Sequence, residues 1–82
     1  MILNAKKYKL GNLELKKNEL RFILLLSDND YHKSNEIRKY LGVWTKASVS
    51  ILKRDINKRA GEELIVTNKF GYKLIPNIEI TY

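Results

Sequence analysis

The spacing of apolar residues along the chain predicts helices separated by turns. Across residues 16–27 apolar side chains recur at intervals of three and four, with Leu24 near the centre, which is typical of a helix. Turn formers follow at 28–30. Ser34 is a favourable N-cap for a second, shorter helix, and Gly42 stands where a left-handed residue favours the end of that helix.

A third helix follows, and it is the most basic element of the chain. Thr45 can cap its N-terminus, and Gly61 favours its end. Its inward stripe recurs at spacings of three, four and four residues and consists of Val49, Leu52, Ile56 and Ala60. We expect the core to join the inward positions of the helices and of the last hairpin, at Leu24, Ile37, Val49, Leu52, Ile56 and Leu74.

Alternation of apolar and polar residues predicts a β-hairpin near each end of the chain. The first covers residues 8–15 around the Gly11-Asn12 pair, which readily takes the positive φ of a tight turn. The second pairs residues 64–67 with residues 70–75 through a turn at Asn68-Lys69. Beyond Pro76, a last short strand is predicted from the alternation of Ile78, Ile80 and Tyr82.

Length and composition indicate a single domain spanning residues 1–82. A chain of 82 residues supports one compact core, and a hydrophobic share of 44% is typical of a folded protein. The absence of cysteine favours an intracellular, cytoplasmic protein. The longest apolar run, at 22–26, is far below the ~20 residues that cross a bilayer, so we expect no membrane partner.

Basic charge is concentrated in the middle of the chain. The sequence contains 16 Lys and Arg residues and 9 Asp and Glu residues, which gives a net charge of +7. Residues 31–61 contribute eight basic and two acidic side chains, whereas the flanking segments are close to neutral. This distribution favours a polyanionic partner such as a nucleic acid, with membrane surfaces and acidic proteins as alternatives.

Two motifs carry a resemblance to known DNA-binding domains. Glu36-Ile-Arg-Lys-Tyr-Leu-Gly-Val43, followed by Thr45-Lys-Ala-Ser-Val-Ser-Ile-Leu-Lys-Arg-Asp-Ile-Asn57, resembles a bacterial helix-turn-helix. Leu64-Ile-Val-Thr-Asn-Lys-Phe-Gly-Tyr-Lys-Leu-Ile-Pro76 is similar to the wing of biotin-repressor-type N-terminal domains. The resemblance implies an α+β winged helix: a three-helix bundle with a helix-turn-helix, a C-terminal hairpin wing and a short N-terminal hairpin.

The subfamily stays open. The Leu-Lys-Arg-Asp-Ile run at 52–56 also resembles DeoR-type and PRD/Mga activator domains. OmpR/PhoB-type effector domains share the Gly-Tyr-Lys-Leu ending and an N-terminal β platform. Arg38 departs from the pattern because the motif usually has a small residue there, and Trp44 adds one residue to the turn. Together they predict a longer turn and a changed angle between the two helices, with Trp44 as an apolar plug or a base-stacking side chain.

The third helix is predicted to enter the major groove, with its N-terminal residues at the base edges. Opposite the inward stripe it presents Thr45, Lys46, Ala47, Ser50, Ile51 and Arg54, with Asn57 at its flank. Arg54 and Lys46 can donate to guanine, whereas Asn57 can pair with adenine. Ile51 can touch a thymine methyl group. Phosphate contacts or solvent exposure are the alternatives for the two cations, and packing under the wing or in a dimer is the alternative for Ile51.

Phosphate contacts are predicted from two further segments. The start of the second helix offers amides and polar side chains at Lys33, Ser34 and Asn35. The last hairpin offers candidates for phosphate or minor-groove contact at Asn68, Lys69 and Lys73. Simple capping by Ser34 and a solvated hairpin turn are the plainer interpretations.

The sequence predicts no catalytic site, metal, cofactor or small-molecule ligand. His32 is the only histidine, and without a cysteine or a second histidine it cannot form a zinc site, so we expect an ordinary surface histidine. No Gly-rich phosphate loop and no nucleophile with a partner base is visible.

We therefore expect sequence-specific binding of double-stranded DNA in transcription regulation. The alternatives are a winged helix that docks an acidic protein and a nonspecific DNA or RNA binder. The target sequence and the oligomeric state stay open. A two-fold symmetric site with half-sites ~10 bp apart would indicate a homodimer.

Overall fold

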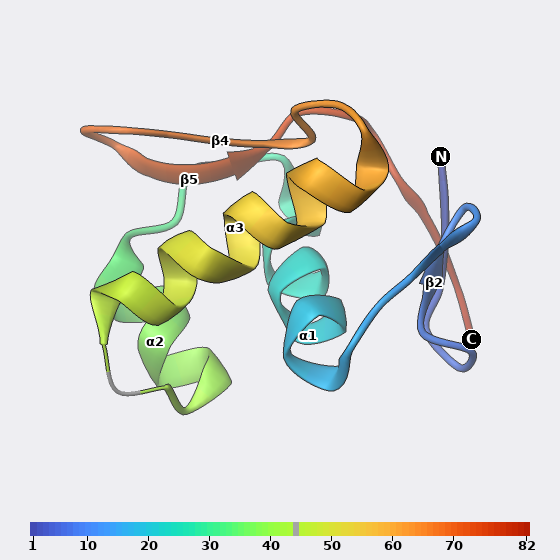
Figure 1. Cartoon of the computed structure of the whole chain (residues 1–82), viewed down its shortest axis with the longest axis horizontal. Helices are drawn as coiled ribbons and strands as arrows, with labels where there is room; N and C mark the ends of the chain where they lie inside the picture. The colour runs from blue at the N-terminus through green and yellow to red at the C-terminus, as the bar shows by residue number, and fades with distance from the viewer. Residues whose placement is uncertain (44) are drawn as a thin grey trace.

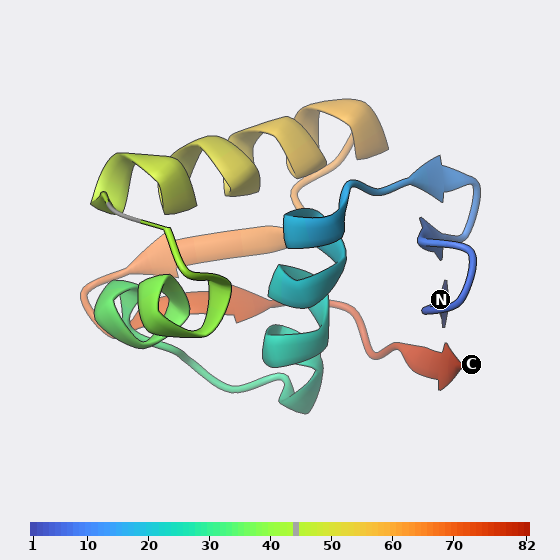
Figure 2. The same ribbon diagram turned by 90° about the horizontal axis from the view of Figure 1, so that it is seen from below.

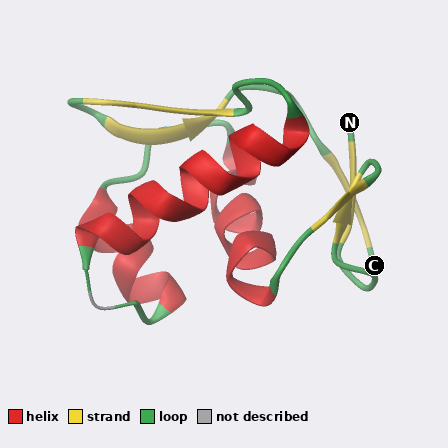
Figure 3. Cartoon of the chain, viewed as in Figure 1, coloured by secondary structure: helices red, strands yellow, loops and turns green. Residues whose placement is uncertain are grey.

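The computed structural model describes residues 1–43 and 45–82. In chain order the elements are β1 (Ile2–Asn4), β2 (Lys9–Leu10), β3 (Leu13–Glu14), α1 (Lys17–Leu25), η1 (Leu26–Asp28), α2 (Ser34–Leu41), α3 (Lys46–Ala60), β4 (Ile65–Asn68), β5 (Gly71–Leu74) and β6 (Glu79–Thr81). The β4–β5 hairpin lies along α3, and the other strands form a separate sheet beyond α1 (Figures 1 and 3). This arrangement confirms the predicted α+β class.

The two ends of the chain meet in one sheet, with strand order β3-β2-β1-β6 (Figure 2). β2 and β3 form the hairpin predicted around Gly11-Asn12, and Gly11 has a positive φ of 59°. The alternation at the C-terminus is confirmed as β6, which runs parallel to β1 and pairs Ile80 with Leu3. β1 is not among the predicted strands, because three residues are too few to display an alternating pattern.

The C-terminal hairpin has the predicted strands but a different turn. Asn68 pairs with Gly71 as part of the ladder, so the turn consists of residues 69–70 and not of Asn68-Lys69. The Asn68 side chain explains this shift, since its Oδ1 accepts a hydrogen bond from the backbone N of Phe70 at 2.8 Å. An Asn that binds the backbone two residues later stabilises a turn that begins after itself.

The segment before α2 joins the edge of this hairpin. His32 and Tyr72 exchange backbone hydrogen bonds of 2.9 and 2.8 Å. Gly71 permits this approach, because a Cβ atom at that position would lie 2.7 Å from the carbonyl carbon of His32. Gly71 also has a φ of 121°, which side-chain-bearing residues rarely adopt. The hairpin is thereby fixed to the start of α2.

The helix ends follow the predicted signals, with one exception. Thr45 caps α3 by accepting a hydrogen bond from the backbone N–H three residues later, at 3.2 Å. α2 ends at Gly42 and α3 at Gly61, with φ of 72° and 74°. The exception is Ser34, which is the first helical residue and not the cap of α2. The N-cap is Lys33, whose backbone is still extended because this segment pairs with β5.

The core contains four of the six predicted positions as fully buried side chains, Ile37, Val49, Ile56 and Leu74. Leu24 and Leu52 are only partly buried and pack against the edge of the core, so these two predictions are wrong. α1 turns Leu20, Phe22 and Ile23 inward, so Leu24 lies at the edge of its buried arc, and Leu52 lies at the margin of the buried face of α3. Apolar side chains that fill the core besides the six predicted positions include Leu3, Phe22, Ile23, Leu26, Leu64 and Ile65.

An ion pair between a buried carboxylate and a partly exposed guanidinium joins α1 to the end of α3. The side chain of Glu19 is 3% exposed, and its Oε2 lies 2.5 Å from a guanidinium nitrogen of Arg59. Its Oε1 accepts a hydrogen bond from the backbone N of Lys16 at 2.8 Å. Arg59 also donates to the backbone oxygen of Glu14 at 2.7 Å, so the same guanidinium ties β3 to both helices.

Trp44, predicted as a plug or a stacking residue, lies outside the described residues. The changed angle between α2 and α3 stays a prediction. In the described ranges, no helix combines the length and the apolar character needed to span a membrane.

Candidate nucleic-acid interface

A hollow of about 320 Å³ lies where the starts of α2 and α3 face the β4–β5 hairpin. Its lining brings together predicted contact residues from separate segments, namely Lys33, Ser34, Lys46, Ser50, Asn68 and Lys69. Thr67, Gly71 and Tyr72 complete the lining. Lys33, Lys46 and Lys69 are all exposed, so three lysines from three parts of the chain border one depression. Such a cluster of cations favours a multiply charged anion.

The outer face of α3 is exposed as predicted. Val49 and Ile56 are fully buried and anchor the opposite side of the helix. The residues that remain accessible on the outer face are Lys46, Ala47, Ser50, Ile51 and Arg54. Ile51 is 45% exposed, so it does not pack beneath the hairpin. The helix therefore presents both cations and an apolar group to solvent.

The depression continues along α3 toward its C-terminal end. A second hollow of about 670 Å³ shares Ser50 and Thr67 with the first. Arg54 and Lys58 line it, and the acidic pair Glu62-Glu63 closes it. Lys58 is a site residue that the sequence analysis missed. Its position four residues after Arg54 places it on the same face of the helix, which is the signal that identifies it.

Asn57 is half-buried and lines the second hollow, but its amide already has partners within the protein, which argues against its assignment to adenine. Its Nδ2 donates to the backbone oxygen of Ile65 at 2.8 Å. Its Oδ1 accepts hydrogen bonds from the backbone N of Leu64 and of Ile65, at 2.9 and 3.0 Å. Both polar ends of the amide are thus used to hold the start of β4 against α3. Asn57 is a structural residue.

The predicted phosphate contacts at the start of α2 are divided between two surfaces. Lys33 lines the first hollow, and its Nζ donates to the backbone oxygen of Lys69 at 3.0 Å. Asn35 lies elsewhere, in a hollow that it shares with Arg38. There its Oδ1 accepts a hydrogen bond from Arg38 at 3.2 Å. The first turn of α2 leaves backbone amides without partners inside the helix, as every helix start does.

The inner side of the hairpin is fixed against α3 by Tyr72. Its hydroxyl lies 3.1 Å from Oγ of Ser50, and its ring packs edge-on against Phe22 with centroids 6.0 Å apart. Lys73, the next residue, is not part of the hollow. Its Nζ lies 5.1 Å from the ring centroid of Tyr31, a cation–π contact. The predicted hairpin residues therefore divide, with Lys69 at the hollow and Lys73 away from it.

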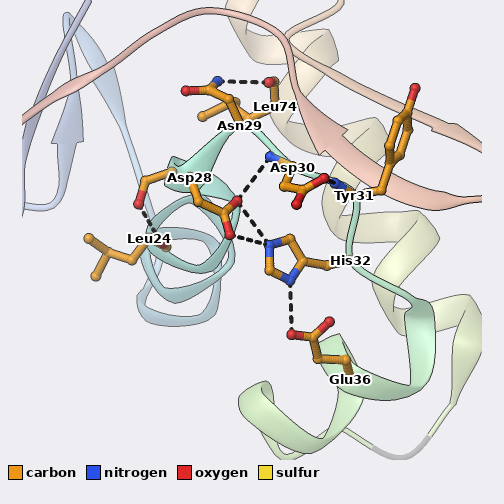
Figure 4. Close-up of polar contacts among 9 residues, drawn as sticks. Leu24, Asp28, Asn29, Asp30, Tyr31, His32, Glu36 and Leu74 are labelled. Atoms are coloured by element: carbon orange, nitrogen blue, oxygen red, sulfur yellow. Dashed lines mark hydrogen bonds and ion pairs between the residues drawn. The ribbon is translucent and has the colours of Figure 1, made fainter.

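His32 is not the ordinary surface histidine that the sequence suggests. Its side chain is only 11% exposed and bridges the end of η1 to the first turn of α2 (Figure 4). Nε2 lies 2.9 Å from Oδ2 of Asp28, and Nδ1 lies 2.9 Å from Oε2 of Glu36. Burial by itself would lower the pKa of His32, but the hydrogen bonds that its ring makes to the carboxylates of Asp28 and Glu36 outweigh burial and raise it. The hydrogen bond with His32 lowers the pKa of Asp28.

Asn29 is a second polar connection that turn propensity alone cannot reveal. It adopts a left-handed conformation with φ of 58°. Its Nδ2 donates to the backbone oxygen of Leu74 at 2.9 Å (Figure 4). The same Nδ2 donates to the backbone oxygen of Pro76, also at 2.9 Å. The loop after η1 is thereby attached to the end of β5.

No protein-family model matches this chain, and no curated protein matches it in sequence.

Proposed function

We propose that this protein is a winged helix-turn-helix protein that binds double-stranded DNA sequence-specifically and acts in transcription regulation. α3 is the recognition helix, α2 and α3 form the helix-turn-helix, and the β4–β5 hairpin is the wing. The observation that carries the proposal is the hollow in which Lys33, Lys46 and Lys69 meet. Cations from two helix starts and a hairpin suit a phosphate backbone that passes between them.

The exposed face of α3 supplies the groups that would read the sequence. Arg54 carries a planar guanidinium that can donate two hydrogen bonds to guanine. Lys46 offers an ammonium group at the start of the helix, which borders the hollow. Ile51 lies between them on the surface and suits the methyl group of thymine. We add Lys58 as a phosphate contact on the same face.

The affinity and the specificity of the complex have separate sources in this proposal. Lys33, Lys69 and Lys58 neutralise phosphates, which makes binding salt-dependent for every duplex. Arg54 and Lys46 act on particular base pairs, so their loss affects the selected sequence more than random DNA. Asn57 has no part in the reading in this proposal, because its amide oxygen and one of its amide N–H groups hold residues 64 and 65.

The experiment first selects binding sites from random duplex DNA and then compares one selected duplex with random duplexes at several salt concentrations. Arg54→Ala is expected to weaken binding to the selected duplex by about 1–3 kcal/mol and to relax the preference at one base pair. Lys69→Ala is expected to weaken binding to all duplexes similarly and to reduce the salt slope by about one unit.

Lys6→Ala is the matched control, because it removes one exposed positive charge from the turn between β1 and β2, at the other end of the molecule. It should change affinity little. Equal effects of all these variants would show that only net charge matters and would favour the nonspecific binder. Retained folding without any affinity for DNA would favour an acidic protein partner.

A further inference from the structure

A cluster of aromatic and basic side chains covers the side of the hairpin opposite Tyr72. It consists of Tyr31, Lys69, Phe70 and Lys73 and is called the wing-face cluster below. The rings of Tyr31 and Phe70 lie 5.7 Å apart between centroids. Lys69 lies over Phe70 at 5.2 Å, and Lys73 lies over Tyr31 at 5.1 Å. Each ring is thus paired with one cation.

The strand register explains why these side chains share one side. Successive residues of a strand point to opposite faces, so Lys73 faces away from Tyr72, which points to α3. His32 pairs directly with Tyr72, which places the preceding residue, Tyr31, on the side of Lys73. The hydroxyl of Tyr31 accepts a hydrogen bond from Nδ2 of Asn68 at 3.1 Å, which fixes the ring there.

The wing-face cluster combines an exposed ring with a second ring that is held in a fixed position. Phe70 is 54% exposed, although it is a large apolar ring at the tip of a hairpin. Tyr31, by contrast, is half-buried and held in place, so it supports Phe70 from behind. Aromatic rings beside lysines are what proteins use to stack the bases of single-stranded nucleic acids while binding their phosphates.

The wing-face cluster is also continuous with the hollow beside α3. Lys69 lines that hollow and at the same time lies over Phe70. A strand whose phosphate contacts Lys69 therefore reaches the exposed ring within the next nucleotide. A paired base inside the duplex cannot offer its face to that ring, because its neighbours in the stack cover both its faces, whereas an unpaired base can.

We propose that Phe70, supported by Tyr31, stacks on an unpaired DNA base next to the bound duplex, while Lys69 and Lys73 contact the adjoining phosphates. The inference rests on the proposed duplex binding and adds a preference that duplex recognition does not imply. The protein should bind a duplex that carries a single-stranded extension more tightly than the same duplex with blunt ends.

The test measures binding of the full chain to a blunt duplex and to the same duplex with a short single-stranded thymine extension. One stacked base is expected to increase the affinity for the extended duplex by about 5- to 150-fold. Phe70→Leu keeps an apolar side chain but removes the ring, so it should lose most of this gain and bind the blunt duplex as before. Phe70→Tyr should retain the gain.

Tyr82→Leu is the matched control, because it removes a ring that is 87% exposed and lies directly after β6, the last strand of the four-stranded sheet. It should leave the gain unchanged. As a direct readout of stacking, a 2-aminopurine base at the first unpaired position should lose fluorescence when wild-type protein binds, and not when Phe70→Leu binds. Melting temperatures of the variants check that the fold is intact.

The outcomes separate the inference from the proposed function. Wild-type protein that binds both duplexes equally, or a gain that survives Phe70→Leu, overturns the inference and leaves duplex binding standing. Failure to bind either duplex overturns both. Binding of the extended duplex alone supports the stacking site and overturns duplex recognition.

Discussion

Individual polar residues attach the hairpin and the loops of this protein to its helices. The Asn57 amide holds the start of β4 to α3, and the Asn29 amide holds the end of β5 to the loop after η1. Glu19 and Arg59 play the same part between α1 and α3. From the sequence alone, each of these side chains is equally compatible with stabilising a turn, facing solvent or contacting DNA. Stability and recognition are therefore separable at the residue scale.

Asn57→Ala is expected to lower the free energy of unfolding by about 1–3 kcal/mol, since it removes the side-chain partner of both the backbone N–H and the backbone oxygen of the buried Ile65. Denaturant unfolding measures the change. Asn77→Ala, at an exposed position, is the control and should have little effect. Unchanged stability together with an altered base preference would contradict the structural role of Asn57.

Gly71→Ala is expected to destabilise the fold by more than about 1 kcal/mol, because the new Cβ atom would collide with the backbone of His32 and the φ of 121° is unfavourable for alanine. Gly11→Ala is the comparison, since Gly11 also has a positive φ but open space around it. Denaturant unfolding of both variants measures the combined effect of the close approach and of the less favourable φ at Gly71. Equal losses would show that His32 and the hairpin do not lie so close together.

Among the elements, His32 connects η1, α2 and the β4–β5 hairpin. Its ring joins η1 to α2 through Asp28 and Glu36, while its backbone pairs with β5. The N-terminus of α2 lines the hollow, so the position of this helix affects the proposed DNA site. The connection depends on protonation, because only the imidazolium donates from both nitrogens.

The contribution of His32 to stability is expected to decrease as the pH rises. The pKa of His32 is raised above its ordinary value of 6.5, so its contribution is complete below about 6.5 and is lost as the pH rises through the folded-state pKa. The pKa of Asp28 is lowered from 3.8, so its contribution is present above that value and is lost as the pH falls through the folded-state pKa. The pair is therefore most effective in mildly acidic solution.

Unfolding of wild type and of His32→Gln over a series of pH values measures this effect. The difference in stability between the two proteins should be largest between about pH 4 and 6.5 and should shrink toward alkaline pH. A difference that is constant or grows with pH would show that the two carboxylates do not bind a protonated His32.

At the scale of the whole molecule, the sequence predicted the elements better than their connections. Helical spacing, strand alternation and caps such as Thr45 and Gly61 are local signals, so they predicted the helices and the hairpins. The pairing of β1 with β6 joins the two ends of the chain and has no local signature. The burial of His32 and the engagement of Asn57 likewise depend on residues from other elements.

The same contrast between local signals and contacts distant in the sequence applies to the proposed site. The exposed face of α3 follows from its inward stripe and was predicted correctly, apart from Asn57 and the omission of Lys58. That Lys33, Lys46 and Lys69 border one hollow follows only from the folded arrangement. Lys73 shows the limit of residue type as a guide, because strand alternation turns it to the other side of the hairpin.

The most direct test of the central claim is an NMR titration of the full chain with duplex DNA, which reports binding and its location together. Amide shifts are expected to concentrate at residues 33–34, 46–58 and 67–72, which border the two hollows and the outer face of α3. Residues 1–15, which include β1, β2 and β3 of the four-stranded sheet, should shift little, since they lie at the other end of the molecule (Figure 1). Shifts confined to the four-stranded sheet, or none at saturating DNA, would contradict the claim that α3 and the hairpin bind duplex DNA.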